Sequence, residues 1–188
     1  MMPLDADNAY RVAVRATRDT LWELLRERIE HPQALAPEVR LLDLVWTSDT
    51  RAMRTVHVSG IPMTEAIELD PQRRRVRLKL HEHPLFDGET LYWLGSEAAA
   101  DGTLELGCAV LWKNRKSGAM VSGLQETVQQ GVLLMKYEAE RRCPGFETVV
   151  DDREVMFESP EYEEFSLRDL RSGAQSGWDA DTDSGDNE

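Results

Sequence analysis

One carboxylate stands out among the side chains that could take part in catalysis. Glu65 is in phase with the apolar residues of segment 61–69, so we expect it on the inner face of a strand. A buried carboxylate loses its hydration, which raises its pKa and suits it to general acid or base catalysis. The alternative is that Glu65 forms an ion pair with an inward-facing arginine such as Arg54, or that a bulge turns it outward.

A histidine could supply the second half of an acid–base pair. His57 precedes the Ser59-Gly60 turn, and Glu65 follows on the strand across that turn. If both side chains face inward, imidazole and carboxylate could act together. Val56 and Val58 compete for the inner face, however, and an exposed histidine at the end of a strand is the alternative.

Metal and cofactor chemistry has little support. His81-Glu82-His83 places two imidazoles on one side of an extended chain, but Pro84 ends the strand directly afterwards and the sequence has only four histidines. We therefore interpret this segment as a solvated rim and expect no metal site. Cys108 and Cys143 form no Cys-x-x-Cys pair and are expected to be reduced thiols. No phosphate-binding loop, dinucleotide fingerprint or nucleophile elbow occurs, so we expect no cofactor.

These candidates are positioned by a chain that is mostly strand. Alternation predicts a first strand over 10–14, and helical spacing predicts a helix that starts near Thr17 and ends before Pro32. Six further strands are predicted over 41–47, 51–58, 61–69, 74–80, 89–96 and 103–112. Their connections are too short for crossover helices, so the sheet should be an antiparallel meander.

A change to helical period then predicts a long final helix over 116–142. Its apolar stripe consists of Met120, Leu124, Val128, Gly131/Val132 and Met135. Roughly 25 helical residues span about 37 Å, which is enough to lie across a sheet. The predicted fold class is therefore α+β: a curved antiparallel sheet of about seven strands around a long C-terminal helix, with one short helix after the first strand.

Composition predicts one globular domain followed by an acidic tail. The chain of 188 residues is 41% hydrophobic and 30% charged, which suits a single domain over 1–146. Residues 147–188 carry 14 acidic side chains against three arginines, so this tail holds −11 of the formal net charge of −13. We expect the tail to be partly docked and then disordered.

Charge and hydropathy also restrict the partners. A nearly neutral body with an anionic tail would be repelled by phosphate backbones, so nucleic acid is not an expected partner. No signal peptide is visible, and no apolar run is long enough to span a membrane, so we expect a cytoplasmic location. The sequence leaves a homodimer open.

The predicted order of elements resembles the SRPBCC superfamily of START-like helix-grip proteins. Within it the chain looks most like the AtaL-like domains of unknown function, with polyketide cyclase/dehydrase-type members as wider relatives. The resemblance covers about residues 8–143 and rests on Thr20–Leu25, the breaks at His31-Pro32 and Ala36-Pro37, and Met63–Ile67. It implies a cavity between sheet and long helix that binds lipids, polyketides or other hydrophobic metabolites.

The inner faces of the strands and of the final helix supply the residues expected to line that cavity. Tyr92 and Trp112 would each offer stacking area and one polar group. The full set is Met63, Ile67, Tyr92, Val110, Trp112, Leu124, Val128 and Met135. Ordinary core packing is the alternative interpretation of these residues.

Two functions of different classes follow from this interpretation. In the first, the protein binds a small hydrophobic metabolite, lipid- or polyketide-like, without changing it. In the second, it is a cyclase or dehydratase of secondary metabolism that moves protons with Glu65, helped by His57 or Tyr92. We favour binding because the expected cavity offers few polar groups. A pure protein-interaction role, carried by the acidic tail, is the third alternative.

Overall fold

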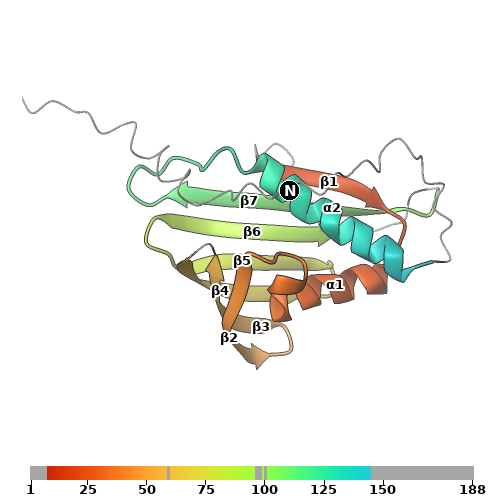
Figure 1. Ribbon diagram of the computed structural model, residues 1–188, viewed down its shortest axis with the longest axis horizontal. Helices are drawn as coiled ribbons and strands as arrows, with labels where there is room; N and C mark the ends of the chain where they lie inside the picture. Colours follow the sequence, from red (N-terminus) through yellow and green to blue (C-terminus); the bar gives the residue numbers. More distant parts are fainter. Residues whose placement is uncertain (1–7, 59, 96–98, 100, 145–188) are drawn as a thin grey trace, which may run out of the picture. The chain divides into compact units, whose positions relative to one another are not determined.

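A seven-stranded antiparallel sheet forms the body of the protein in a computed structural model that describes residues 8–58, 60–95, 99 and 101–144 (Figure 1). The strands are β1 (Ala9–Val14), β2 (Val39–Ser48), β3 (Arg51–Val58), β4 (Ile61–Asp70), β5 (Arg75–Glu82), β6 (Phe86–Leu94) and β7 (Leu104–Asn114). Their order across the sheet is β1-β7-β6-β5-β4-β3-β2. Strands β2 to β7 therefore form the predicted meander, which is confirmed, and β1 pairs with its last strand. The acidic tail predicted over 147–188 lies outside the described residues.

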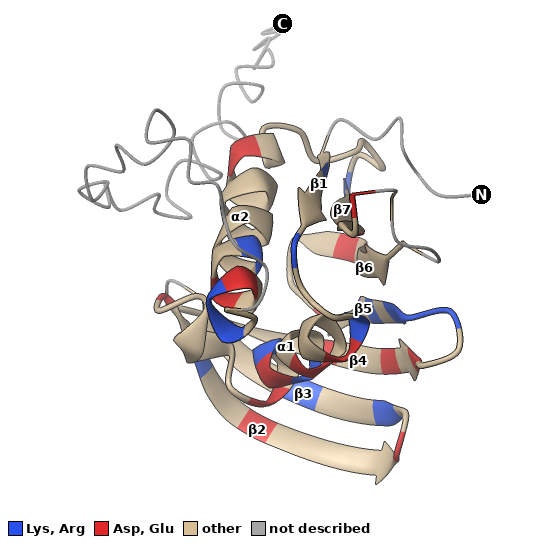
Figure 2. Ribbon diagram, turned by 90° about the vertical axis from the view of Figure 1, so that its right-hand side faces the viewer, with Lys and Arg blue, Asp and Glu red and all other residues tan. Residues whose placement is uncertain are grey.

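Two α-helices lie on the concave face of the sheet. Helix α1 (Arg18–Glu30) follows β1, the 3-10 turn η1 (Pro32–Ala34) follows α1, and α2 (Gln125–Arg142) is the last element of the described residues. The N-cap Thr17 holds the start of α1 by accepting a hydrogen bond from the backbone N–H of Thr20 at 3.1 Å. Figures 1 and 2 show α2 crossing β1 and β7 obliquely, with both helices inside the curve of the sheet. The predicted α+β architecture is therefore confirmed. No helix in the described part of the chain is long and apolar enough to cross a membrane.

The final helix begins later than the sequence predicts, at Gln125 rather than at residue 116. Gly118 and Gly123 have φ angles of +70° and +80°, which glycine adopts readily but which an α-helix excludes. The chain ahead of α2 instead turns back to make an isolated bridge between Lys113 and Met120. Met120 is consequently 49% exposed and does not belong to the predicted apolar stripe.

Strand β6 begins earlier than predicted, at Phe86 rather than at Glu89. The Asp87-Gly88 pair, which resembles a turn in sequence, lies within the strand. Gly88 has a φ of +126°, and a Cβ at this position would overlap the carbonyl oxygen of Leu111 on β7. Glycine is thus required here by a close approach of two backbones.

Within the described residues, most of the buried apolar side chains form two separate clusters on the inner face of the sheet. The main core joins the helices to the sheet and includes Leu21, Leu25, Ile67, Leu106, Val132 and Met135. The second cluster consists of Val56, Met63, Leu80 and Phe86. On β3 and β4, two buried charged residues, Arg54 and Glu65, stand between the members of these clusters. Trp112 packs against both clusters from β7.

On the opposite face, Trp93 covers β7 at a glycine. Trp93 pairs in register with Gly107, is almost fully buried, and donates from its Nε1 to Glu105 Oε1 at 3.0 Å. A Cβ on Gly107 would overlap the six-membered ring of this indole. The indole can lie flat on the sheet only because residue 107 has no side chain.

We expect Gly107→Ala to lower the free energy of unfolding by about 1–3 kcal/mol, because the added methyl group forces the Trp93 ring out of its position. Urea unfolding measures the change. The matched control is Gly107→Ala in a Trp93→Leu background, where the smaller side chain leaves room and the alanine should cost much less. Equal costs in both backgrounds would contradict this account of the packing.

Candidate functional site

Glu65 lies on the inner face of the sheet, and its carboxylate forms an ion pair with Arg54. The two side chains are 3% and 5% exposed, and their residues pair in register across the β3–β4 hairpin. Arg54 donates from both Nε and Nη2 to Glu65 Oε2, at 3.0 and 2.5 Å. Of the alternatives that the sequence leaves open for Glu65, the structure contains the ion pair with Arg54.

This ion pair also fixes the end of helix α1. Arg54 donates from Nη1 to the backbone carbonyls of Arg28 and Ile29, at 2.9 and 3.2 Å. These carbonyls belong to the last turn of the helix, where intrahelical donors run out. Glu65 therefore neutralises the guanidinium that caps α1. Protonating Glu65 would leave that guanidinium buried without a counter-ion, which favours a structural role for Glu65 over a proton-transfer role.

His57 and Glu65 are not brought together. His57 pairs with Pro62 on β4 and alternates with the inward-facing Arg54 and Val56. Since successive side chains on a strand point to opposite faces, His57 lies on the outer side of the sheet. The acid–base pair that required both side chains to face inward is therefore absent.

All eight predicted lining residues are buried in a core cluster or pack against one. Six are buried: Ile67, Tyr92, Val110, Val128 and Met135 in the main core, and Met63 in the second cluster. Trp112 and Leu124 are partly buried and pack against the main core, Leu124 as the residue that precedes α2. A role of these residues in ligand contact stays a prediction.

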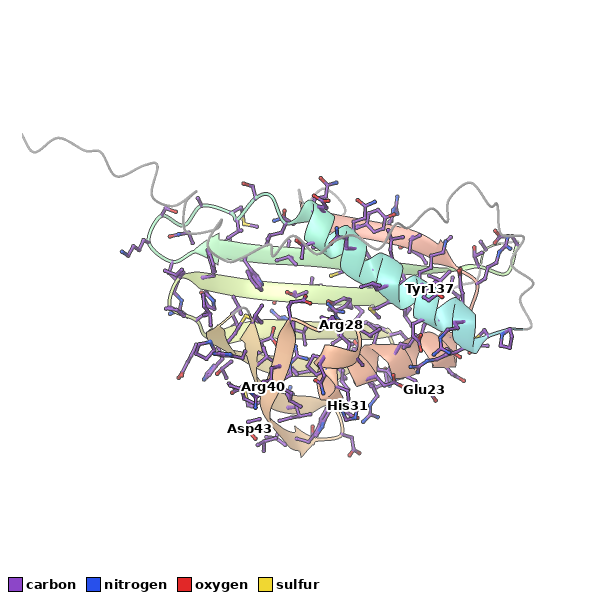
Figure 3. All side chains as sticks on the ribbon, in the orientation of Figure 1. Glu23, Arg28, His31, Arg40, Asp43 and Tyr137 are labelled. Carbon is purple, nitrogen blue, oxygen red and sulfur yellow. The ribbon has the colours of Figure 1, made fainter. Side chains whose placement is uncertain are left out.

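Arg28 is an interior residue that the sequence analysis missed. It follows Leu24 and Leu25 by four and three positions, so it falls on the apolar face of α1. Its Nε donates to the Tyr92 hydroxyl at 2.8 Å, and its guanidinium carbon lies 5.4 Å from the centre of the Tyr92 ring. Figure 3 shows Arg28 between α1 and β6. A charged residue in phase with an apolar stripe was the signal that could have identified it.

The charge of Arg28 is not neutralised by its neighbours. Burial raises the pKa of the Tyr92 hydroxyl, and burial raises the pKa of the Cys108 thiol to about 12, so both groups are uncharged at neutral pH. Among the described residues, no carboxylate forms an ion pair with Arg28, and its Nη1 is buried without a hydrogen-bond partner. Arg28 as a whole is only partly buried, but a buried donor without a hydrogen-bond partner is costly unless something pairs with it.

Trp112 provides a second free donor on the same inner face. Its indole Nε1 is buried and has no hydrogen-bond partner. Its ring stacks on Phe86 at a centroid distance of 6.0 Å and lies 6.4 Å from His83. Trp112 follows Cys108 by four residues on β7, which corresponds to about 13 Å along a strand. In the part of the chain that the structure describes, Arg28 Nη1 and Trp112 Nε1 are thus unpaired donors at separate positions.

The predicted solvated rim at His81-Glu82-His83 is wrong for His83. His81 is exposed, but His83 is buried, and its Nδ1 accepts from the backbone N–H groups of Leu85 and Phe86 at 3.2 and 3.1 Å. Burial, with a contribution from Arg115, lowers the pKa of His83. Within the ranges that the structure describes, no group of three or more His, Cys, Asp or Glu side chains could hold a metal ion.

Comparison with known proteins identifies the fold. The crystal structure of Zhui aromatase/cyclase from Streptomyces sp. R1128 is similar over 72% of this chain and 93% of its own, with 19% identity and a TM-score of 0.53. A START superfamily protein from Mycobacterium smegmatis is similar over 71% and 97%, with 14% identity and a TM-score of 0.53. A protein from Thermus thermophilus is similar over 71% and 97%, with 13% identity and a TM-score of 0.52. No family model and no curated protein matches the chain.

The chain therefore has the START-like helix-grip fold that its sequence resembles. At these identities the likeness concerns the fold alone, and a fold does not specify a function. The narrower resemblance to AtaL-like domains stays a prediction.

We expect Glu65→Gln to lower the free energy of unfolding by about 3–5 kcal/mol, because Arg54 then stays buried without a counter-ion. Chemical unfolding measures the loss. The control is the double variant Arg54→Met/Glu65→Leu, which removes both charges and should recover most of the stability. A Glu65→Gln protein as stable as the parent would contradict the structural role assigned to the pair.

Stability should also depend on the protonation of His83. Its folded-state pKa lies below its unfolded-state value of about 6.5, so the unfolded chain takes up the proton first as the pH falls. The contribution of His83 is therefore complete above about pH 6.5 and decreases as the pH falls through the folded-state pKa.

The control variant is His83→Asn, whose side-chain oxygen can accept from the same backbone N–H groups without titrating. We expect the parent to lose more stability than this variant between about pH 8 and pH 5, measured by unfolding at each pH. Parallel pH profiles for the two proteins would be inconsistent with this assignment.

Proposed function

We propose that the protein binds a small hydrophobic metabolite, lipid- or polyketide-like, in a cavity between the sheet and the helices. The observation that carries this proposal is the pair of buried donors without partners, Arg28 Nη1 and Trp112 Nε1. Buried polar groups are nearly always hydrogen-bonded, and each unsatisfied one costs about 1–3 kcal/mol. A ligand with oxygen acceptors would supply the missing partners.

The division of the apolar interior supports the same location. The main core and the second cluster are separate, and Trp112 reaches both. A hydrophobic molecule placed along the inner face of β6 and β7 would contact apolar side chains of both clusters, such as Val110 and Met63. The two donors would then act on polar groups carried by that molecule. Most ligand sites combine an apolar lining with a few such polar groups.

Binding is favoured over a cyclase or dehydratase reaction because no proton-transfer set is assembled among the described residues. Glu65 is the counter-ion of Arg54, and His57 lies on the outer face. Burial raises the pKa of Tyr92, which makes this hydroxyl a poor acid or base at neutral pH. The similar fold of an aromatase/cyclase keeps the enzyme as the alternative function. That alternative requires measurable turnover of a polyketide-like substrate.

The proposal is tested by titrating the delipidated full-length chain with the neutral fluorescent probe N-phenyl-1-naphthylamine. We expect saturable binding of one probe per chain. Val128→Trp, which places an indole on the buried side of α2, should weaken binding at least about tenfold by filling the site. The control is Leu134→Trp on the same helix, where the parent side chain is 41% exposed and the affinity should not change.

Native mass spectrometry of the protein as purified provides a second readout, because a retained metabolite adds its mass to the chain. An interior that takes up neither the probe nor a co-purifying molecule would overturn the proposal.

A further inference from the structure

At Gly131, helix α2 presents no side chain to the guanidinium of Arg28. Gly131 is the residue of α2 that faces it, and a Cβ built there would meet Arg28 Nη2 at 3.6 Å and no other atom within 4 Å. Glycine in the interior of a helix costs about 1 kcal/mol relative to alanine. At this position, the absence of a side chain keeps space free beside the guanidinium.

The orientation of the guanidinium is fixed before any ligand arrives. Nε donates to the Tyr92 hydroxyl, and the guanidinium carbon lies over the Tyr92 ring. The main chain of Arg28 is held in turn by Arg54, which donates to its carbonyl oxygen. These contacts use Nε and do not involve the two terminal nitrogens. Of these, Nη1 is buried without a hydrogen-bond partner. The terminal nitrogens of arginine form a planar fork that matches a carboxylate.

The unbalanced positive charge of Arg28 favours an anionic over a neutral ligand group as its partner. Arg54 and Glu65 neutralise each other, Tyr92 and Cys108 are uncharged, and the exposed Glu38 acts on Arg28 only from beyond ion-pair distance. A neutral carbonyl on the ligand would satisfy the hydrogen bond but leave the charge of the partly buried guanidinium without a counter-ion. A carboxylate would satisfy both.

We propose that Arg28 is an anion-recognition residue, and that the natural ligand is an elongated hydrophobic acid whose carboxylate binds the terminal nitrogens of Arg28. This inference rests on the proposed function and specifies the chemistry of the ligand at that site. The apolar body of the acid would extend along β6 and β7 towards Trp112, whose free indole N–H then binds a second oxygen; the backbone of Trp112 lies about 13 Å along β7 from Cys108, the register partner of Tyr92. Several fused rings or a chain of about ten carbons has this length.

The test compares two ligands of the same shape, the anion 2-naphthoate and the neutral 2-naphthamide, in which NH2 replaces one oxygen, by competition against N-phenyl-1-naphthylamine on the full-length chain. We expect the parent protein to bind the acid at least about tenfold more tightly than the amide. In Arg28→Met this preference should fall below about twofold, while the neutral probe still binds. The matched control is Arg26→Met on the same helix, where the parent arginine is exposed and the preference should be unchanged.

A second pair of variants tests the site without removing Arg28. Gly131→Leu should place a side chain over the guanidinium and weaken binding of the acid more than binding of the neutral probe. Gly131→Ala adds only a methyl group at van der Waals distance and should preserve the preference for the acid.

Equal affinity for acid and amide in the parent protein would overturn this inference, as would a preference that survives in Arg28→Met or Gly131→Leu. In either case, retained binding of the neutral probe would leave the proposed function standing. Failure of the parent to bind the neutral probe would instead overturn the proposed function, and this inference with it.

Discussion

A buried ion pair between Arg54 and Glu65 joins the last turn of α1 to the sheet, and the arrangement of the interior depends on it. The two residues face each other across the β3–β4 hairpin, so the register of one turn brings them together. Through its remaining nitrogen, Arg54 holds the carbonyl oxygens of Arg28 and Ile29. The end of α1 is thereby placed so that the Arg28 side chain meets Tyr92 on β6. Breaking the pair would disturb both the helix cap and the position of this second guanidinium.

Arg54, which is buried, and Arg28, which is partly buried, differ in their charge balance. Arg54 has a carboxylate within hydrogen-bonding distance, whereas Arg28 has a neutral hydroxyl and a free Nη1. An apolar environment does not favour an unbalanced cation, so we expect the partly buried Arg28 to cost stability unless something pairs with it. Proteins accept such costs where function requires them. This contrast assigns a structural role to Arg54 and supports the proposed ligand-binding role of Arg28.

The helix-grip fold itself does not distinguish between binding and catalysis, because function depends on the side chains that the sheet and the helices enclose. In the described part of this chain the groups that could move protons are dispersed. Glu65 is engaged by a cation, His57 lies on the outer face, and His83 accepts two backbone hydrogen bonds just beyond the end of β5. The groups that could recognise a ligand are instead the free donors of Arg28 and Trp112.

The sequence by itself predicted the strands, the meander and the inner faces, with Glu65 in phase with the buried residues, because alternation with period two and short connections are local properties of the chain. The tertiary structure decided where α2 starts and that His83 is buried. It also decided that Arg28 has no carboxylate partner among the described residues. Left-handed glycines displaced the start of the helix, and the backbone N–H groups after Pro84 engaged His83. The isolation of Arg28 depends on which groups of β6, β7 and α2 surround it, and these come from segments more than sixty residues away. Whether a buried charge is paired is a property of three-dimensional neighbours, which a local pattern does not contain.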